Sequence, residues 1–392
     1  MILLHWGEND MNSEVKNMET ILPFGNTLKP LVASSNILSM SDLKGSLAQK
    51  GIFTSSSSKE DILPLMLTSL LSPTEFENLK EKQKDKESIP KRRSKSFNYK
   101  GTGKLIDLIS ELNLVNVKNF KQWELENYEI VDVNSFTMIE KNVNKLRTTY
   151  RIKRSDYIKD WFNQVSYHDA VLEISLDEGN NRIVISTEAS TDETRELNDI
   201  LSKKVSTVLK EGNLIENEKG QEIKFGDFTN ENRINFLLNF ANDDLDHSQT
   251  FKFDKITNIE ISIDPEKTLP DKFEWMENKV SNMKFEGAAL HETEILKDTK
   301  YHPSLIISLL KINYSFEIKS TTGNCIVEIE FPTKRGKSMP DSKSEFQFKF
   351  TKITCNNKID TRAAQITLYR LFDTYKDVCY KRTTSTNDFD EM

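Results

Sequence analysis

The stretch that decides the fold runs from residue 171 to residue 185 and reads VLEISLDEGNNRIVI. In its first half, Leu172, Ile174 and Leu176 occupy every second position, which is the pattern of a half-buried strand. The polar cluster at residues 177–181 then supplies turn residues, and the apolar residues 183–185 carry the chain back. We therefore predict an antiparallel hairpin here.

Helices and further strands follow this hairpin. Apolar residues from Leu197 to Leu209 recur at helical spacing and predict a helix over 192–211, with another at about 230–241. Alternating apolar residues predict four more strands, at residues 251–264, 312–320, 325–331 and 345–355. A last helix is predicted at about 361–380. Hairpins followed by helices, without a repeat of fixed length, indicate an α+β fold with an antiparallel sheet and helices packed on one face.

Composition divides the chain into five regions. Residues 1–24 lack any period and are predicted to be a flexible leader, whereas residues 25–87 predict a small helical module. Residues 88–104 contain six basic residues and no acidic residue, so we predict a basic linker there. The α+β region then spans residues 105–382 and can be divided into subdomains at 105–245 and 246–382. Residues 383–392 are predicted to be a disordered acidic tail.

The charge balance limits where nucleic acid could bind. The chain has 54 Lys+Arg and 61 Asp+Glu, a net charge of −7, which excludes a uniformly basic surface. Subtracting the +6 of residues 88–104 from −7 leaves −13 for the remainder, so any nucleic-acid contact is expected near residues 41–104.

Cysteine spacing and hydropathy bear on the compartment. Cys325, Cys355 and Cys379 are 30 and 24 residues apart, which fits neither a disulfide framework nor a zinc site. No apolar run is long enough for a membrane span. We expect a reducing, cytoplasmic location.

Residues 41–63 read SDLKGSLAQKGIFTSSSSKEDIL and resemble the SAP domain, a module of two helices joined by an extended loop. Residues 43–52 match the first helix of that family and its exit, and residues 59–63 match the start of the second helix. Ser57 and Leu65 stand where the family usually has Gly and Arg. The resemblance extends over about residues 39–68 and implies DNA contact by this module.

Two segments carry the predicted nucleic-acid contacts. In the module, lysines, serine hydroxyls and the N–H groups of the second helix can bind phosphate oxygens. In the linker, basic residues alternate with rings on which a base can stack. The predicted residues are Lys44, Lys50, Ser57, Ser58, Lys59, Lys91, Arg92, Arg93, Lys95, Phe97, Tyr99, Lys100 and Lys104. The alternatives are an ordinary helix cap at Ser58 and a basic tether that binds nothing.

A metal-dependent nuclease is a second hypothesis. Glu317 and Lys319 lie on the polar face of one predicted strand, and Glu317-Ile318-Lys319 resembles the Glu-x-Lys strand of restriction-endonuclease-like nucleases, which implies Mg²⁺. A turn centred on residues 322–323 would place Glu317 opposite Glu328, and these three residues are the catalytic candidates. In the alternative, Lys319 or Lys349 only neutralises the two carboxylates.

Taken together, these patterns favour binding over catalysis. We predict an intracellular protein that contacts nucleic acid or a protein partner through its N-terminal module and basic linker, as a subunit of a bacterial defence assembly would. A protein partner or a second copy of the chain is expected, and a membrane is not. No cofactor is expected unless the nuclease hypothesis holds, in which case it is Mg²⁺. The third hypothesis is a purely structural subunit of a protein complex.

Overall fold

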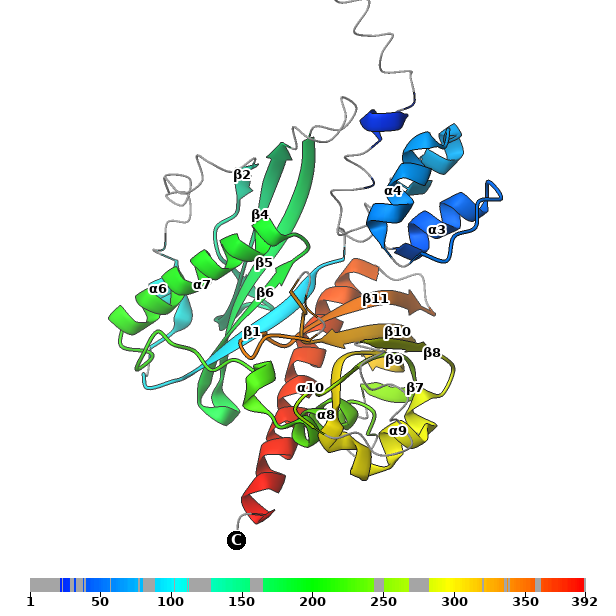
Figure 1. Cartoon of the computed structure of the whole chain (residues 1–392). Helices are drawn as coiled ribbons and strands as arrows, with labels where there is room; N and C mark the ends of the chain where they lie inside the picture. The colour runs from blue at the N-terminus through cyan, green and yellow to red at the C-terminus, as the bar shows by residue number, and fades with distance from the viewer. Residues whose placement is uncertain are drawn as a thin grey trace, which may run out of the picture.

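The computed structural model of the chain is drawn in Figure 1. It describes residues 22, 24–28, 32, 38, 40–56, 58–76, 78–79, 89–101, 103–110, 112, 128–155, 165–242, 250–267, 282–318, 321–334, 337, 339–356 and 361–390. A small helical module belongs to the N-terminal part, a large sheet forms the centre, and a long helix ends the chain (Figure 1).

The strands form one eleven-stranded sheet in the order β2-β4-β5-β6-β1-β11-β10-β9-β7-β8, with β3 paired to β4. All the pairings are antiparallel. The strands are β1 (Lys91–Asn98), β2 (Tyr128–Val133), β3 (Thr137–Ile139), β4 (Asn142–Ser155), β5 (Val165–Asp177), β6 (Arg182–Ala189), β7 (Phe251–Ile263), β8 (Met283–Glu286), β9 (Leu305–Ile318), β10 (Thr321–Glu330) and β11 (Gln347–Cys355).

The α-helices accompany this sheet and confirm the predicted α+β class. They are α3 (Met40–Ala48), α4 (Lys59–Thr68), α6 (Leu105–Ile109), α7 (Asp192–Glu211), α8 (Asn230–Asn239), α9 (Glu294–Lys297) and α10 (Thr361–Asp390).

The predicted hairpin is formed by β5 and β6, with Leu176 opposite Ile183. The chain reverses through a short 3₁₀ segment, where the Asp177 side chain accepts a hydrogen bond from the Asn180 N–H and Asn181 adopts a left-handed φ of 48°. The next predicted helix, α7, has the predicted bounds and begins at a capping box made by Thr191 and Thr194. Local turn and capping chemistry therefore fixes this region.

Two hydrophobic cores lie on opposite faces of the sheet. The first is built on β4, β5 and β6 under α6 and α7, and it includes Phe97 of β1. The second is built on β7, β9, β10 and β11 under α8 and α10. Successive side chains of a strand point to opposite faces. Phe97 therefore lies on the α7 face, whereas Arg92, which contacts α10, lies on the other. Each half of the sheet has its hydrophobic core on one face, and that face differs between the halves.

The prediction of a basic linker at residues 88–104 is wrong. Residues 91–98 are β1, which pairs along its whole length with β6 and lies near the middle of the sheet. Basic side chains are compatible with this central position because acidic partners from several other elements surround them, as described below.

Two other predicted boundaries also differ from the structure. The backbone of residues 383–390 continues α10, so a disordered tail from residue 383 is wrong. The two cores divide between Ile215 and Ile234, before α8 rather than after it, because α8 packs into the second core. Nearly all of the predicted leader, residues 1–24, lies outside the described residues.

Candidate functional sites

The N-terminal module has a hydrophobic core of its own. Leu43 and Leu47 of α3 are fully buried against Ile62 and Met66 of α4. Gly51 ends the turn after α3 with a positive φ of 75°, which glycine adopts without strain. The two helices therefore pack together as the sequence indicates.

The N-terminus of α4 is already capped by residues of the module. The Ser58 hydroxyl accepts a hydrogen bond from the Glu60 N–H at 3.1 Å. Ser58 is thus an ordinary helix cap, which is the alternative to phosphate binding given above for this residue. Glu60 and Asp61 occupy the first turn, and the Ser56 hydroxyl donates to Asp61 at 2.6 Å. Two carboxylates therefore stand where a bound phosphate would have to approach.

The lysines of the module do not create a basic surface. Lys50 forms an ion pair with Glu75 at 2.8 Å, and this hydrogen bond lowers the pKa of the Glu75 carboxyl. Lys44 and Lys59 are half-buried on α3 and α4, and Ser57 lies outside the described residues. Over residues 26–89 the sequence has eight Lys and eight Asp+Glu, a net charge of zero.

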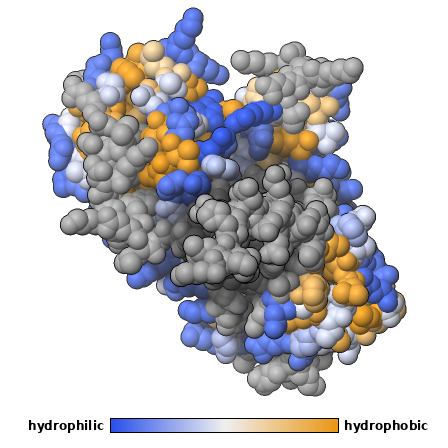
Figure 2. Space-filling view, turned by 90° about the horizontal axis from the view of Figure 1, so that it is seen from above, coloured by the Kyte–Doolittle hydropathy of each residue, from blue (hydrophilic) through white to orange (hydrophobic). Residues whose placement is uncertain are grey.

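Large apolar side chains are exposed on the same module. Phe53, in the loop before α4, is 82% exposed, and Leu70, directly after α4, is 75% exposed. On the face in Figure 2, apolar residues occur in separate patches with hydrophilic residues between them. Scattered single apolar residues are ordinary on a surface, but these two are the most exposed of the large apolar side chains that the structure describes.

Most predicted binding residues of the basic segment have partners within the chain. Lys91 pairs with Glu330 at 2.7 Å, Lys95 with Glu222, and Lys100 with Glu216 at 2.9 Å. Arg93 donates to Gln347 at 3.0 Å and to Glu345 at 3.5 Å. Phe97 is buried, the Tyr99 hydroxyl donates to the Gly103 carbonyl, and Lys104 is exposed before α6. The segment acts mainly as a source of internal cations.

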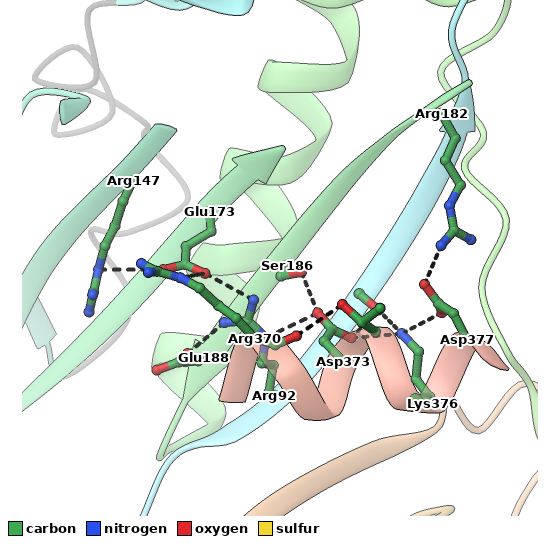
Figure 3. A network of polar contacts seen from close by, with 12 residues as sticks. Arg92, Arg147, Glu173, Arg182, Ser186, Glu188, Arg370, Asp373, Lys376 and Asp377 are labelled. Carbon is green, nitrogen blue, oxygen red and sulfur yellow. Dashed lines mark hydrogen bonds and ion pairs between the residues drawn. The ribbon is translucent and has the colours of Figure 1, made fainter. Parts of the chain in front are cut away.

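Arg92 is the centre of a buried ionic cluster, drawn in Figure 3. Its side chain is 3% exposed and donates to Glu173 of β5 at 2.9 Å, to Glu188 of β6 at 2.6 Å and to Asp373 of α10 at 3.1 Å. Burial alone would lower the pKa of the guanidinium, but the three carboxylates reverse this effect and raise it. Arg92 therefore stays charged and shares its charge with carboxylates from two strands and one helix.

The pKa values of the three carboxylates around Arg92 are shifted in different directions. Burial opposes ionisation of Glu173, but Arg92 and Arg370 overcome it and lower the pKa of Glu173 to about 2. Burial is likewise overcome at Asp373, where Lys376 and Arg92 hold the pKa well below its ordinary value. At Glu188 burial prevails and raises the pKa.

Contacts from α10 extend this cluster into a seam along the helix (Figure 3). Arg370 pairs with Glu173 at 2.7 Å, and the Ser186 hydroxyl of β6 donates to Asp373 at 2.6 Å. One turn later Asp377 pairs with Arg182. We call these contacts between the polar face of α10 and strands β1, β5 and β6 the α10 seam.

The α10 seam leaves little room for a ligand. A pocket of about 10 Å³ lies beside it, lined by Arg93, Ser94 and Glu345 among others. That volume holds about one water molecule. The contacts of the seam join α10 to β1, β5 and β6.

The predicted nuclease residues do not come together. In the register of β9 and β10, Glu317 lies opposite Thr322 and Glu328 lies opposite Lys311, so the expected pairing of Glu317 with Glu328 is wrong. Six residues of strand separate the two positions, which is roughly 20 Å.

Glu328 instead has a structural partner. It pairs with Lys349 at 2.6 Å and with Lys311 at 3.4 Å, as the structural alternative proposes for Lys349. Lys319 lies outside the described residues. Within the part of the chain that the structure describes, no three His, Cys, Asp or Glu side chains are placed to hold a metal ion.

Comparison with known families bears on the module. Residues 26–89 match the family model described as the GAPS4b protein N-terminal domain. This is a defence-associated domain, and the match includes both α3 and α4. It does not confirm the resemblance to the SAP domain. A search of curated proteins finds no match to this chain, and no described helix is long and apolar enough to cross a membrane.

Sequence reasoning did not anticipate the α10 seam. Its partners are far apart along the chain, because Arg92 is 81, 96 and 281 residues from Glu173, Glu188 and Asp373. One signal was available: Glu173 stands between the apolar residues Leu172 and Ile174 of a predicted strand, where a buried carboxylate needs a cation. A basic stretch elsewhere in the chain could have supplied it.

Proposed function

We propose that this chain is a partner-binding subunit of a bacterial defence assembly, and that its N-terminal module binds a protein partner. The match of residues 26–89 to a defence-associated domain supports the setting. The observation that carries the proposal is the exposure of Phe53 and Leu70 on a module whose own core is complete. Burial of such side chains is a main source of binding energy at protein interfaces.

Charge favours a protein over a nucleic acid as the partner of this module. A nucleic acid is bound chiefly through its phosphates, and affinity then comes from an excess of cations. Residues 26–89 have no such excess of cations. The carboxylates of Glu60 and Asp61 lie in the first turn of α4, where they would repel a phosphate. A neutral surface with prominent apolar residues suits a protein interface better.

Nucleic-acid contact is a second candidate with one observation in its favour. Phe53 protrudes from a serine-containing loop that leads to Lys59, so a base could stack on its ring while hydroxyls and N–H groups contact the phosphates. In this case the lysines of the module would contribute affinity that falls as salt is raised.

Copurification from the native host tests the proposal. The tagged chain is compared with Phe53→Asp and Leu70→Asp, and each sample is isolated with and without nuclease treatment. A protein partner should be retained by the wild type after nuclease and lost from the two variants. Met138→Asp is the matched control, because Met138 of β3 is also an exposed apolar residue but lies on the sheet.

The possible results separate the two candidates. Loss of a specific protein from the module variants alone supports protein docking. Retention that depends on nucleic acid, and that Lys44→Glu with Lys59→Glu abolishes, supports the second candidate instead. If both aspartate variants retain the same proteins as the wild type, the module does not dock through these residues and the proposal is wrong.

A further inference from the structure

The large sheet is composed of two lobes. The N-lobe contains β1–β6 with α6 and α7, and the C-lobe contains β7–β11 with α8 and α10. The hydrophobic core of each lobe is made of its own buried residues, and no buried residue belongs to both cores. The sheet is continuous, but the protein consists of two units that each pack around a separate core.

The two lobes share little strand pairing. At the junction, the one register pair between β1 and β11 among the described residues joins Arg92 and Phe348. By contrast, β1 pairs with β6 at eight positions, and β10 pairs with β11 at eight. Pairing between neighbouring strands is the main non-covalent interaction that holds a sheet together. The β1–β11 junction, with its single described register pair, is therefore the weakest strand–strand contact in this sheet.

The segment between the lobes adds backbone contacts at this junction. Gln221 exchanges backbone hydrogen bonds with Ser96 of β1, and Ile223 accepts one from Phe346 at 2.8 Å. Phe225 donates to the Ser344 carbonyl at 2.9 Å. This segment therefore lies against both lobes and forms a strap along the junction, close to where a hinge would bend.

Helix α10 contacts the two lobes with different faces. Leu368, Tyr369 and Phe372 are buried in the core of the C-lobe. The other face carries Asp373 and Asp377, which contact the N-lobe only through ion pairs and hydrogen bonds in the α10 seam. The apolar face fixes α10 to the C-lobe. On the polar face, water molecules can take the place of each hydrogen-bonding partner when the contact with the N-lobe opens.

We propose that the two lobes are hinged at the β1–β11 junction and that the α10 seam is a releasable latch holding them closed. The closed state shields the charges of the seam, and opening exposes them to water without disturbing either hydrophobic core. Such an opening is a low-energy alternative to global unfolding, because it sacrifices polar contacts and one register pair rather than a core. The proposal does not depend on the identity of any partner of the module.

Thiol labelling under native conditions tests the latch. Ser186 lies on the N-lobe side of the seam, is buried, and contacts Asp373 of α10, so Ser186→Cys places a thiol that opening would expose. Cys355→Ser removes a partly exposed native thiol, while Cys325, buried in the C-lobe core, reports global unfolding. We expect the thiol at position 186 to react with a maleimide at least about tenfold faster than Cys325, as sub-global opening predicts.

A second arm alters the latch itself. Asp377→Asn weakens the contact with Arg182 and should speed labelling at position 186 several-fold while leaving Cys325 unchanged. Glu216→Gln is the matched control, because Glu216 pairs with Lys100 on the exposed surface of the N-lobe. It should change neither rate.

The opposite results would overturn the proposal. If the thiol at position 186 and Cys325 react at one rate, or if Asp377→Asn accelerates both equally, the lobes separate only when the protein unfolds. Ser94→Cys provides a second placement should Ser186→Cys not fold, because Ser94 of β1 also donates to Asp373. Because Ser94 is half-buried rather than buried, this variant is judged only by whether Asp377→Asn speeds labelling at position 94 while leaving Cys325 unchanged.

Discussion

Arg92 Nε of β1 donates to Asp373 Oδ2 of α10 at 3.1 Å, although the two residues are 281 positions apart in the chain. This bond ties a central strand to the last helix of the protein. Because Glu173 and Glu188 bind the same guanidinium, one buried cation balances carboxylates from three different elements. The cluster therefore joins β1, β5, β6 and α10 through one set of buried charges.

Removing the cation should be costly. Arg92→Met keeps an unbranched apolar stem but removes the guanidinium and leaves three carboxylates without their shared partner, so the free energy of unfolding should fall by about 3–5 kcal/mol. Urea denaturation followed by circular dichroism measures this loss. Arg151→Met, which breaks an exposed pair with Asp169, should cost no more than about 1 kcal/mol. Equal losses from the two variants would contradict a special role for Arg92.

The cluster should also govern acid stability. Glu173 has a folded-state pKa of about 2 against an ordinary value of 4.5, so its contribution to stability is present above about pH 4.5 and is lost as the pH falls towards 2. Asp373 has a lowered pKa and acts in the same direction. Glu188 has a raised pKa and acts in the opposite direction, because its stabilising contribution is lost as the pH rises.

Two variants separate these contributions when urea midpoints are measured between about pH 6 and pH 2. Glu173→Gln should be less stable than the wild type at the upper end, and the difference should shrink as the pH falls, because the wild-type carboxyl also becomes neutral. Glu188→Gln should lose relatively more stability than the wild type on acidification. A pH profile of Glu173→Gln parallel to that of the wild type would show that Glu173 is not the titrating group.

The N-terminal module should unfold separately from the sheet, because it has its own core. Leu47→Ala removes a fully buried side chain from that core and should destabilise the module by about 2–5 kcal/mol. Differential scanning calorimetry of the full chain should then show a transition of the module shifted to lower temperature, with the main transition unchanged. Phe53→Ala changes an exposed residue, so it should alter the free energy of unfolding of either transition by no more than about 0.5 kcal/mol.

Local patterns predict the elements whose structure depends on their own residues. The β5–β6 hairpin and α7 follow from alternation, turn residues and the Thr191 cap, all within a few residues of each other. The core-facing residues of β9, among them Ile312, Tyr314 and Phe316, are also where period-two alternation puts them. These features need no knowledge of the rest of the chain.

The basic segment could not be assigned in this way. Six cations without an acid in 17 residues are typical of a solvated linker, and nothing nearby in sequence indicates otherwise. Its strand character depends on Glu173, Glu188 and Asp373, which the fold brings from distant positions. Tertiary context overrides local pattern here, because the fold supplies acidic partners to Lys91, Arg92, Arg93 and Lys95.

The β9–β10 register gives a last prediction, at Gly323. The sequence places this glycine at the centre of a turn, whereas in the structure Ile318 pairs with Thr321 and Gly323 lies inside β10. A Cβ at Gly323 would lie 2.1 Å from the Thr354 carbonyl oxygen, which is backbone and cannot move aside cheaply. Gly323→Ala should therefore destabilise the protein by about 1–3 kcal/mol, as overpacking does.

Gly179 supplies the matched control for this test, because it lies in the observed turn between β5 and β6 and a Cβ there meets only the Asp177 side chain, at 3.7 Å. Gly179→Ala should change the free energy of unfolding by no more than about 0.5 kcal/mol in urea denaturation. If Gly323→Ala behaved in the same way, Gly323 would have the open surroundings of a turn residue. The register with Glu317 opposite Glu328 would then have to be considered again, and with it the nuclease hypothesis.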